Sequence, residues 1–565
     1  MTIHLAQAKT QQVAWRQAAG GTAMVAAAVC LFMVTMLVLT IAEERRQTPL
    51  NSPQIAAMKQ ELVDRSNDEA LKERIRQTDQ KLRATYFASQ KQVKRGAWLL
   101  VAAGAALALA LKSYSTLAAE PPKLTGERPD TWQEKKLARL GVAVSAAVIV
   151  GSAGAWAVLS RPELPEVKEA GPVLPPAGPE LLAKGWPSFR GFPGDGVVAA
   201  GSMPQAWDGA AGKGIAWKSS VPLPGHGSPV VFGGLVFLAG SDGTSQEVFA
   251  FDDASGQLKW RGSVPRGTLQ NPNVFEDTGH AAATPVTDGV RVYAMFATGD
   301  LAAFDYSGKR LWNKNLGVSE STYGYAASLA MDKGNVIVQF DQTSDPDSGK
   351  SALLCFDGAT GRQVWKTPRP VENSWSSPIV AGGRIYTTGN PWVIAYDATS
   401  GKEIWKAKLL EGDVAASPVF RDGVLYVAND RAVAAAIRAD GKGDVTATHV
   451  LWTNKEPLLP DIVSPLTDGK RLLLTHGGGT LTCLDAVTGK EVWTHDVGGT
   501  VHASPVLVGD RVYLTSDDGV THVFGLGAEF KELGAFPLGE KVSASPAVMD
   551  GRMFIRGKEN LYCIK

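Results

Sequence analysis

The sequence is poor in cysteine and carries almost no net charge. Its four cysteines, at positions 30, 355, 483 and 563, form no CxxC motif, no vicinal pair and no CxxCH haem motif. Their spacing therefore gives no signal for a redox pair, a zinc site or a covalent haem. The formal net charge at pH 7 is +1 over 565 residues, which argues against nucleic-acid binding. A P-loop, a GxSxG motif and an HExxH motif are also absent from the sequence, so the common signatures of nucleotide, serine-hydrolase and zinc-protease chemistry are missing.

Long apolar stretches are present near the N-terminus. Residues 19–41 contain no charged side chain, and a helix of that length can span a bilayer. Two further apolar stretches follow, although Lys112 interrupts the first of them. We therefore predict about three transmembrane helices within residues 1–160, at 19–41, 97–118 and 139–160.

A polar helix is predicted between the first two of these stretches. Residues 55–92 are heavily charged, with apolar residues at roughly helical spacing, which is typical of an amphipathic helix. This segment is either a solvated connector or a helix that pairs with a partner. Residues 161–185 are rich in proline, so we expect a semi-rigid linker that separates the membrane region from residues 186–565.

The rest of the chain repeats one pattern, Ala-x-Asp-x-x-Thr/Ser-Gly-x-x-x-Trp. Copies occupy residues 250–260 and 395–405, copies with Cys in the first position occupy 355–365 and 483–493, and a copy one residue shorter occupies 303–312. A period of this size is the signature of a radial or solenoidal array. The tryptophans of the pattern and its equivalents are Trp217, Trp260, Trp312, Trp365, Trp405, Trp452 and Trp493. We expect these rings to dock structurally between units, because a large indole is well suited to burial there.

A second repeated signal gives the number of units. A Ser-Pro or Thr-Pro pair, or Ser328-Leu329 in one case, opens an apolar run at Ser228, Thr284, Ser328, Ser377, Ser417, Ser464, Ser504 and Ser545. Each run is followed by a tight turn and further strands, which predicts eight four-stranded antiparallel blades. The chain ends after a third strand at residues 560–564. We therefore expect an N-terminal strand at residues 214–221 to complete the last blade and close the ring.

At this point the repeat resembles a known family. The pattern is similar to the tryptophan-docking motif of eight-bladed propellers of the pyrroloquinoline quinone (PQQ) type, over about residues 186–565. That family includes quinoprotein alcohol dehydrogenases and the propeller lipoprotein of the outer-membrane protein assembly machinery. The opening Trp186-Pro-Ser-Phe-Arg-Gly191, followed by Gly194-Asp195-Gly196, resembles the PQQ-binding-like β-propeller repeat proteins. The resemblance implies an all-β propeller with an α-helical N-terminal membrane region.

The resemblance also indicates where a cofactor would bind. Quinoprotein dehydrogenases carry a vicinal cysteine pair and a set of Glu, Asn and Asp around Ca²⁺, and this sequence has no Cys-Cys pair. Glu372, Asn373 and the nearby Trp375 are the candidate cofactor-binding residues of this sequence. The loop 341–349 is acidic, and is either a Ca²⁺ loop or a plain hairpin; it lacks the closing Glu of an EF-hand.

Residues just before the inner strands are expected to face the mouth of the ring. They include His226, Trp375, Ile462, His502 and Ser543, with His280 nearby. The candidate metal ligands are His226, His280 and His502, because two or three histidines around a funnel can bind a metal. The alternative is that these histidines are structural or solvated.

Together these features predict a bacterial inner-membrane protein with a cytoplasmic N-terminus and a periplasmic propeller. We expect it to bind a protein partner in the envelope as a non-catalytic scaffold, without catalytic residues, cofactor, metal or nucleic acid. One alternative is a PQQ-dependent dehydrogenase that uses calcium and passes electrons to the membrane. Another is a sensor or carbohydrate-binding module.

Overall fold

The chain divides at residue 172 into two units, Met1–Pro172 and Val173–Lys565. The structure is a computed structural model that describes residues 2–46, 78, 100, 103–104, 106–114, 174–198, 201, 203–268 and 270–565. The predicted segments 55–92 and 139–160, except for residue 78, lie outside the described residues, as do residues 161–173 of the predicted linker.

The first unit contains the long helix α1 (Thr2–Arg46). Within it, Val13–Met36 is long and apolar enough to cross a membrane. The described part of the predicted segment 97–118 is also helical. Its Tyr114 ring lies against Gly20 of α1, where an added Cβ would come within 3.2 Å of the ring. The Arg16 guanidinium stands 5.3 Å from the same ring, so these two helical segments pack on each other.

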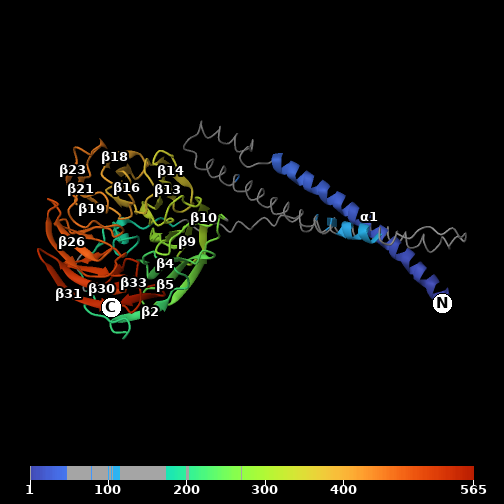
Figure 1. The fold of residues 1–565 in the computed structure, drawn as a ribbon, viewed down its shortest axis with the longest axis horizontal. Helices are drawn as coiled ribbons and strands as arrows, with labels where there is room; N and C mark the ends of the chain where they lie inside the picture. Colours follow the sequence, from blue (N-terminus) through green and yellow to red (C-terminus); the bar gives the residue numbers. More distant parts are fainter. Residues whose placement is uncertain are drawn as a thin grey trace. The chain divides into compact units, whose positions relative to one another are not determined.

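The second unit is a β-propeller, whose described strands form eight sheets (Figure 1). Blade 1 contains β3 (Val230–Phe232), β4 (Leu235–Ser241), β5 (Gln246–Asp252) and β6 (Leu258–Ser263). Blade 2 contains β7 (Val286–Thr287), β8 (Arg291–Met295), β9 (Asp300–Asp305) and β10 (Arg310–Asn315). Blade 3 contains β11 (Ala330–Asp332), β12 (Asn335–Phe340), β13 (Ala352–Asp357) and β14 (Gln363–Pro368). Blade 4 contains β15 (Ile379–Ala381), β16 (Arg384–Gly389), β17 (Trp392–Asp397) and β18 (Glu403–Lys408).

The second half of the ring repeats this order. Blade 5 contains β19 (Val419–Arg421), β20 (Val424–Ala428), β21 (Ala434–Arg438) and β23 (Val450–Asn454). Blade 6 contains β24 (Leu466–Thr467), β25 (Arg471–Thr475), β26 (Thr480–Asp485) and β27 (Glu491–Asp496). Blade 7 contains β28 (Val506–Val508), β29 (Arg511–Thr515), β30 (Val520–Leu526) and β31 (Phe530–Pro537). Blade 8 contains β32 (Ala547–Met549), β33 (Arg552–Arg556), β34 (Asn560–Ile564) and β2 (Ile215–Ser220).

Three short elements add to this plan. The strand β1 (Val197–Val198) pairs parallel with β28, and β22 (Gly443–Asp444) pairs parallel with β18. The four-residue helix α5 (Pro179–Leu182) precedes the first strand.

The ring closes with a strand from the other end of the chain, as predicted. Strand β2 pairs antiparallel with β34, and Trp217 lies opposite Cys563. Figure 1 shows β2 beside the C-terminus. Because β2 pairs with β34, the edge of β34 that faces away from β33 is covered. A covered strand edge cannot pair with another chain.

The core lies between neighbouring blades. Val236 and Phe251 of blade 1 are buried in one cluster with Phe554 and Tyr562 of blade 8. Strands of this kind are buried on both faces, which explains why the second and third strands read as continuous apolar runs rather than as alternating ones.

The first position of the repeat pairs directly with the tryptophan. Ala250 lies opposite Trp260, and Cys355 and Cys483 lie opposite Trp365 and Trp493. The register shifts immediately after each of these pairs, which is the mark of a β-bulge. The small residue leaves room for the indole, and Cys355, Cys483 and Cys563 are buried free thiols. Burial raises the pKa of the Cys355 thiol to about 12.

Six of the seven repeat tryptophans donate a hydrogen bond to a backbone carbonyl of the next blade. The indole Nε1 atoms of Trp217, Trp260, Trp312, Trp405, Trp452 and Trp493 lie 2.8 to 3.1 Å from these oxygens. Each ring packs on the next blade as well. A Cβ on Gly489, whose φ is +69°, would lie 2.5 Å from the Trp452 ring. Only glycine meets both the conformation and the contact.

Candidate functional site

A cavity of about 410 Å³ lies at the centre of the ring. The eight opening residues, each two positions before an inner strand, all line it: Ser228, Thr284, Ser328, Ser377, Ser417, Ser464, Ser504 and Ser545. The residue two positions before each of these also lines it: His226, Ala282, Ala326, Trp375, Ala415, Ile462, His502 and Ser543. The prediction that residues just before the inner strands face the mouth is therefore confirmed.

The opening residues are joined by hydrogen bonds around the ring. The backbone N–H of Ser228 donates to the hydroxyl of Thr284, and six further successive pairs from Thr284 to Ser545 repeat this contact, at 2.8 to 3.2 Å. Each bond satisfies a buried amide that has no partner within its own blade. The small hydroxyl residues at these positions therefore link the blades at the axis.

The segment 186–196 forms the floor of the cavity. It begins on blade 1, where Trp186 pairs with Val231, and reaches blade 6, where Arg190 Nη2 donates to the carbonyl of Pro465 at 2.7 Å. Between these contacts, Phe189 lines both the upper cavity and a second cavity of about 440 Å³ on its other side. Burial lowers the pKa of Arg190 to about 10. Phe189 thus forms part of the wall of both cavities.

Aromatic rings line one side of the mouth. They are Phe275, Tyr323 and Trp375, from the loops that follow blades 1, 2 and 3. The Phe275 and Tyr323 ring centroids are 5.0 Å apart, and those of Tyr323 and Trp375 are 4.8 Å apart. The indole N–H of Trp375 donates to the Gly324 carbonyl at 2.9 Å, which fixes the last ring. We call these three residues the aromatic arc.

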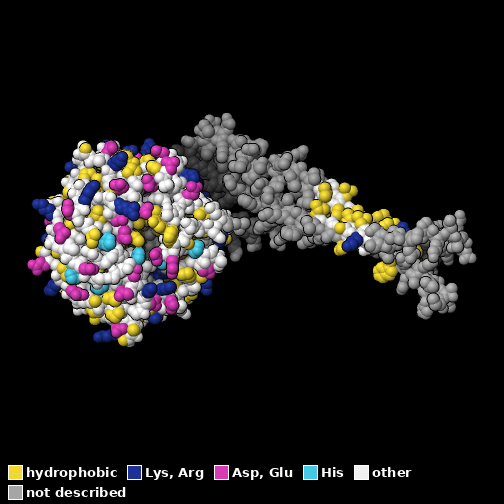
Figure 2. Space-filling view, viewed as in Figure 1, with side chains coloured by type: hydrophobic (Ala, Val, Ile, Leu, Met, Phe, Trp, Pro, Cys, Tyr) yellow, Lys and Arg dark blue, Asp and Glu magenta, His cyan; other side chains and the backbone are white. Residues whose placement is uncertain are grey.

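Carboxylates follow further around the ring. Asp413, Asp430 and Asp461 line the cavity from loops of blades 4 to 6, and we call them the acidic arc. Burial raises the pKa of Asp430, while its neighbour Arg431 lowers it. The charges of Asp461 and Asp413 add to the effect of burial, so the net shift is upward. A fourth lining carboxylate, Asp277, belongs to the Phe275 loop. Charged residues of both signs are scattered over the face of the propeller in Figure 2.

Histidines complete the circle. The Nδ1 atom of His226 lies 2.7 Å from Ser543 Oγ, and that of His502 lies 2.6 Å from Asp517 Oδ2. Burial lowers the pKa of His226, whereas the hydrogen bond to Asp517 raises the pKa of His502. Among the described residues, no group of three or more His, Cys, Asp and Glu is placed to hold a metal ion.

The other candidates from the sequence are not part of the cavity wall. His280 is not among its lining residues, and its ring packs against Gly243. Glu372 and Asn373 are also outside the lining, although Trp375 belongs to it. The Asn373 side chain is turned into the protein, where its Oδ1 accepts from the Thr322 amide at 3.2 Å.

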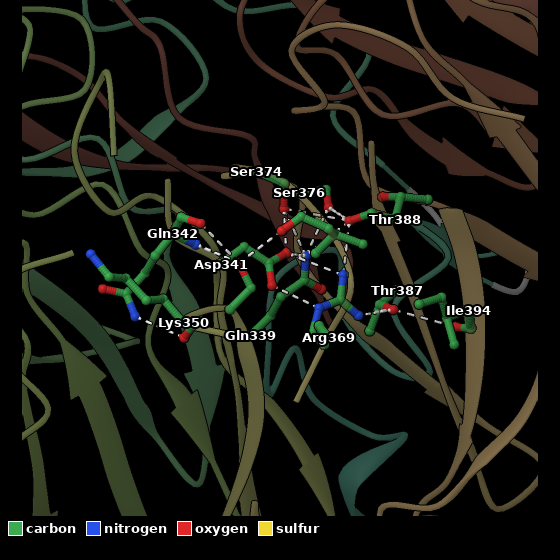
Figure 3. Close-up of polar contacts among 12 residues, drawn as sticks. Gln339, Asp341, Gln342, Lys350, Arg369, Ser374, Ser376, Thr387, Thr388 and Ile394 are labelled. Carbon is green, nitrogen blue, oxygen red and sulfur yellow. Dashed lines mark hydrogen bonds and ion pairs between the residues drawn. The ribbon is translucent and has the colours of Figure 1, made fainter. Parts of the chain in front are cut away.

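The loop considered for Ca²⁺ begins at a buried ion pair instead. Asp341 and Arg369 have fully buried side chains and are joined by Nε–Oδ1 and Nη2–Oδ2 contacts of 2.7 and 3.1 Å (Figure 3). Ser374 also donates to Asp341 at 2.7 Å, and Arg369 donates to the Thr387 hydroxyl of blade 4. Asp341 raises the pKa of Arg369 despite its burial. This network joins blades 3 and 4.

Sequence reasoning missed most of the aromatic and acidic arcs. Of these residues the sequence predicts only Trp375, because it occupies the repeated position before an inner strand. Tyr323 and Phe275 stand five and nine residues before their strand openings, so no constant spacing marks them. The available signal was chemical, since each lies in a connecting loop that leads to the mouth.

Parts of known proteins resemble this chain. A stretch of 93 residues is 33% identical to the glycerol dehydrogenase large subunit of Gluconobacter oxydans (strain 621H), and it covers 14% of this chain and 12% of that protein. The chain therefore matches only a small part of that relative's length. The quinohemoprotein alcohol dehydrogenase from Comamonas testosteroni has a TM-score of 0.51 at 15% identity, covering 68% of this chain and 80% of that one. BamB from Moraxella catarrhalis has a TM-score of 0.47 at 15% identity, covering 62% and 97%.

The family is shown by a match to a family model. The model described as outer membrane protein assembly factor BamB matches residues 170–344, 349–444 and 442–529. These ranges make up more than half of the chain and span all of blades 1 to 6, together with most of blade 7. The chain belongs to the family of outer membrane protein assembly factor BamB, as an eight-bladed β-propeller of the PQQ type.

Proposed function

We propose that this protein is a membrane-anchored scaffold of the bacterial cell envelope, which binds a partner protein through its propeller and is not an enzyme. Membership of the BamB family supports a role in protein interaction. The apolar segment Val13–Met36 supports a membrane anchor. We further propose that the membrane is the inner one, with the N-terminus in the cytoplasm and the propeller in the periplasm. The side chains that line the central cavity are the observation that favours a scaffold over a dehydrogenase.

The cavity does not suit PQQ with calcium. PQQ carries three carboxylate groups, so it requires cationic partners. The lining contains four aspartates, and no Lys or Arg is among its described residues. The buried Arg190 and Arg556 donate instead to backbone carbonyls. The lining therefore offers PQQ no cationic side chain, its described carboxylates do not converge on a calcium position, and Glu372 and Asn373 stand outside it.

The face around the mouth offers a surface for a partner. Three apolar side chains in its loops are exposed, namely Phe275 at 51%, Leu458 at 55% and Ile462 at 42%. Exposed apolar groups surrounded by polar ones are typical of protein-binding sites. We therefore place the contact with the partner on the loops that surround the cavity.

Site-specific photo-crosslinking tests this assignment in living cells. A photoreactive amino acid at Leu458 is expected to give one defined crosslinked protein, identified by mass spectrometry. The matched control is Val487, which is 72% exposed in the β26–β27 hairpin, away from the cavity lining. Equal crosslinking of the same protein from both positions would contradict the proposal.

The dehydrogenase alternative is tested on the purified protein. The short stretch of identity with the glycerol dehydrogenase large subunit is the observation that favours it. Saturable binding of PQQ with Ca²⁺, together with dye reduction by alcohols or sugars, would overturn the scaffold proposal. We expect neither.

Reporter fusions after residues 42, 120 and 185 test the membrane topology. We expect a periplasmic signal after residue 185. A cytoplasmic signal there would overturn the proposed location of the propeller.

A further inference from the structure

The mouth of the central cavity combines two kinds of side chain that both attract positive charge. The aromatic arc offers the ring of Phe275, which is 51% exposed, and that of Tyr323, which is partly exposed, whereas Trp375 is nearly buried. A ring face carries negative electrostatic potential. The acidic arc offers three carboxylates. The hydroxyl of Tyr323 donates to Asp413 Oδ2 at 3.2 Å, so the two arcs meet at this contact.

Few positively charged side chains lie near the rings and carboxylates of the cavity wall, and no Lys or Arg is among its described lining residues. Arg431 lies on the rim, where its Nε is 3.9 Å from Asp430 and its side chain is 71% exposed. His502 is already paired with Asp517 at 2.6 Å. Asp461 accepts only a backbone N–H, from Gly477 at 3.1 Å, and no ion pair is described for it. Asp461 and Asp277 therefore keep capacity for an outside cation.

The geometry points to an organic cation, an ammonium or guanidinium group, bound in the mouth between the aromatic arc and the acidic arc. The cavity volume of about 410 Å³ falls within the usual range for small-ligand sites. A cation in this position would contact ring faces on one side and carboxylates on the other. Its source is either a free amine or a basic side chain of a partner protein. In the second case the inference rests on the scaffold function proposed above.

Neutral sugars and metal ions fit this wall less well. A sugar platform needs an open aromatic face, but Trp375 is only 7% exposed. The rings of Phe275 and Tyr323 meet at 68° and those of Tyr323 and Trp375 at 54°, so they form a bent wall instead of a flat one. The described carboxylates do not converge on a metal position.

Calorimetric titration of the full-length protein in uncharged detergent tests the inference. The probes are spermidine and a short glycine-flanked arginine peptide, with the same peptide carrying citrulline as the neutral control. Citrulline keeps the shape of arginine without its charge. We expect at least one cationic probe to bind, the citrulline peptide to bind about 10-fold more weakly or not at all, and added salt to weaken binding.

Variants locate the binding. Tyr323→Leu is expected to weaken the binding of the cation about 10-fold, whereas Tyr323→Phe, which keeps the ring, is expected to weaken it less. The double variant Asp413→Asn/Asp461→Asn is expected to weaken it about 10-fold. Asp347→Asn is the matched control, because Asp347 is exposed in the β12–β13 hairpin and does not line the cavity.

The outcomes separate the possibilities. Tighter binding of the peptide than of spermidine would indicate a basic side chain as the source, and the reverse order would indicate a free amine. Equal binding of the citrulline peptide, stronger binding of a neutral oligosaccharide, or no binding of either cation would overturn the inference. The crosslinking result from Leu458 would stand in each of these cases, so failure here is distinguishable from failure of the scaffold proposal.

Discussion

Trp217 on β2 lies opposite Cys563 on β34, and its indole N–H donates to the carbonyl of Asp253 in blade 1 at 3.0 Å. One side chain thus connects the N-terminal strand, the last blade and the first blade. Its ring also packs against Gly256 of blade 1 and lies 6.0 Å from the ring of Phe554 in blade 8. Trp217 therefore contacts both blades that meet where the ring closes.

Replacing Trp217 by Ala is expected to destabilise the propeller by about 3–5 kcal/mol, because it removes a buried aromatic ring and leaves a cavity at the closure. Chemical denaturation followed by tryptophan fluorescence measures the change. Ser220→Ala, at an exposed position on the same strand, is the control and should change stability by less than about 0.5 kcal/mol. A similar loss in both variants would show that the closure is not centred on Trp217.

Two neighbouring tryptophans provide an internal comparison. Trp405 Nε1 donates to the Ala439 carbonyl at 3.0 Å, whereas the buried Nε1 of Trp365 has no partner among the described residues. Trp405→Phe should therefore cost about 1 kcal/mol more than Trp365→Phe, since only the first substitution removes a hydrogen bond. Unfolding midpoints of the two variants measure this difference. Equal costs would mean that Trp365 also has an acceptor in solution.

The repeating part of the architecture could be predicted from the sequence. The spacing of Ala250 to Trp260 and of its copies recurs because each blade needs the same bulge and the same indole contact. The strand at 214–221 could be assigned to the last blade because the chain ends one strand short. The wall position two residues before each opening residue could also be predicted, and it includes Trp375 and His502.

The ring of hydroxyls at the axis gives a third prediction. Ser417→Ala removes the acceptor of the Ser377 amide, which lies 2.8 Å from Ser417 Oγ. A buried amide without an acceptor costs about 1–3 kcal/mol. Ser417→Thr keeps the hydroxyl, and Thr284 already fills the equivalent place, so this variant should retain most of the stability. Thermal unfolding of both variants decides the point, and equal stability of Ala and wild type would contradict it.

The buried ion pair gives a fourth prediction. Arg369→Met leaves Asp341 as a buried carboxylate without its cation, which is expected to cost about 3–5 kcal/mol. Lys350→Met is the matched control, because the Lys350–Glu320 pair has the same 2.7 Å contact but is about half exposed, and exposed pairs contribute about 0–1 kcal/mol. Denaturant midpoints measure both. Comparable losses would show that burial of the pair is unimportant.

Features outside the repeat were not predictable from the sequence. The sequence presents Asp341 only as part of an acidic loop, because nothing in it places Arg369 beside Asp341. Phe189 belongs to a segment that occurs once, so no period assigns it to the floor of the channel. The same reasoning applies to Tyr323 and Asp413, which meet only because loops from blades 2 and 4 converge on the axis.

The pair His502–Asp517 makes stability depend on pH. Asp517 raises the pKa of His502 above its ordinary value of about 6.5, so the folded protein favours the charged imidazole. The resulting stabilisation is fully present below about pH 6.5 and is lost as the pH rises through the raised pKa. Asp517→Asn should therefore reduce the free energy of unfolding by about 1 kcal/mol more at pH 6 than at pH 9. The pKa values of His280 and His522 are lowered without any contribution from His502, so their titration cancels in the difference. Charge on His502 helps to lower the pKa of His226, so part of the effect passes through His226. Denaturation curves at the two pH values measure the effect, and an equal loss at both would contradict the role of the pair.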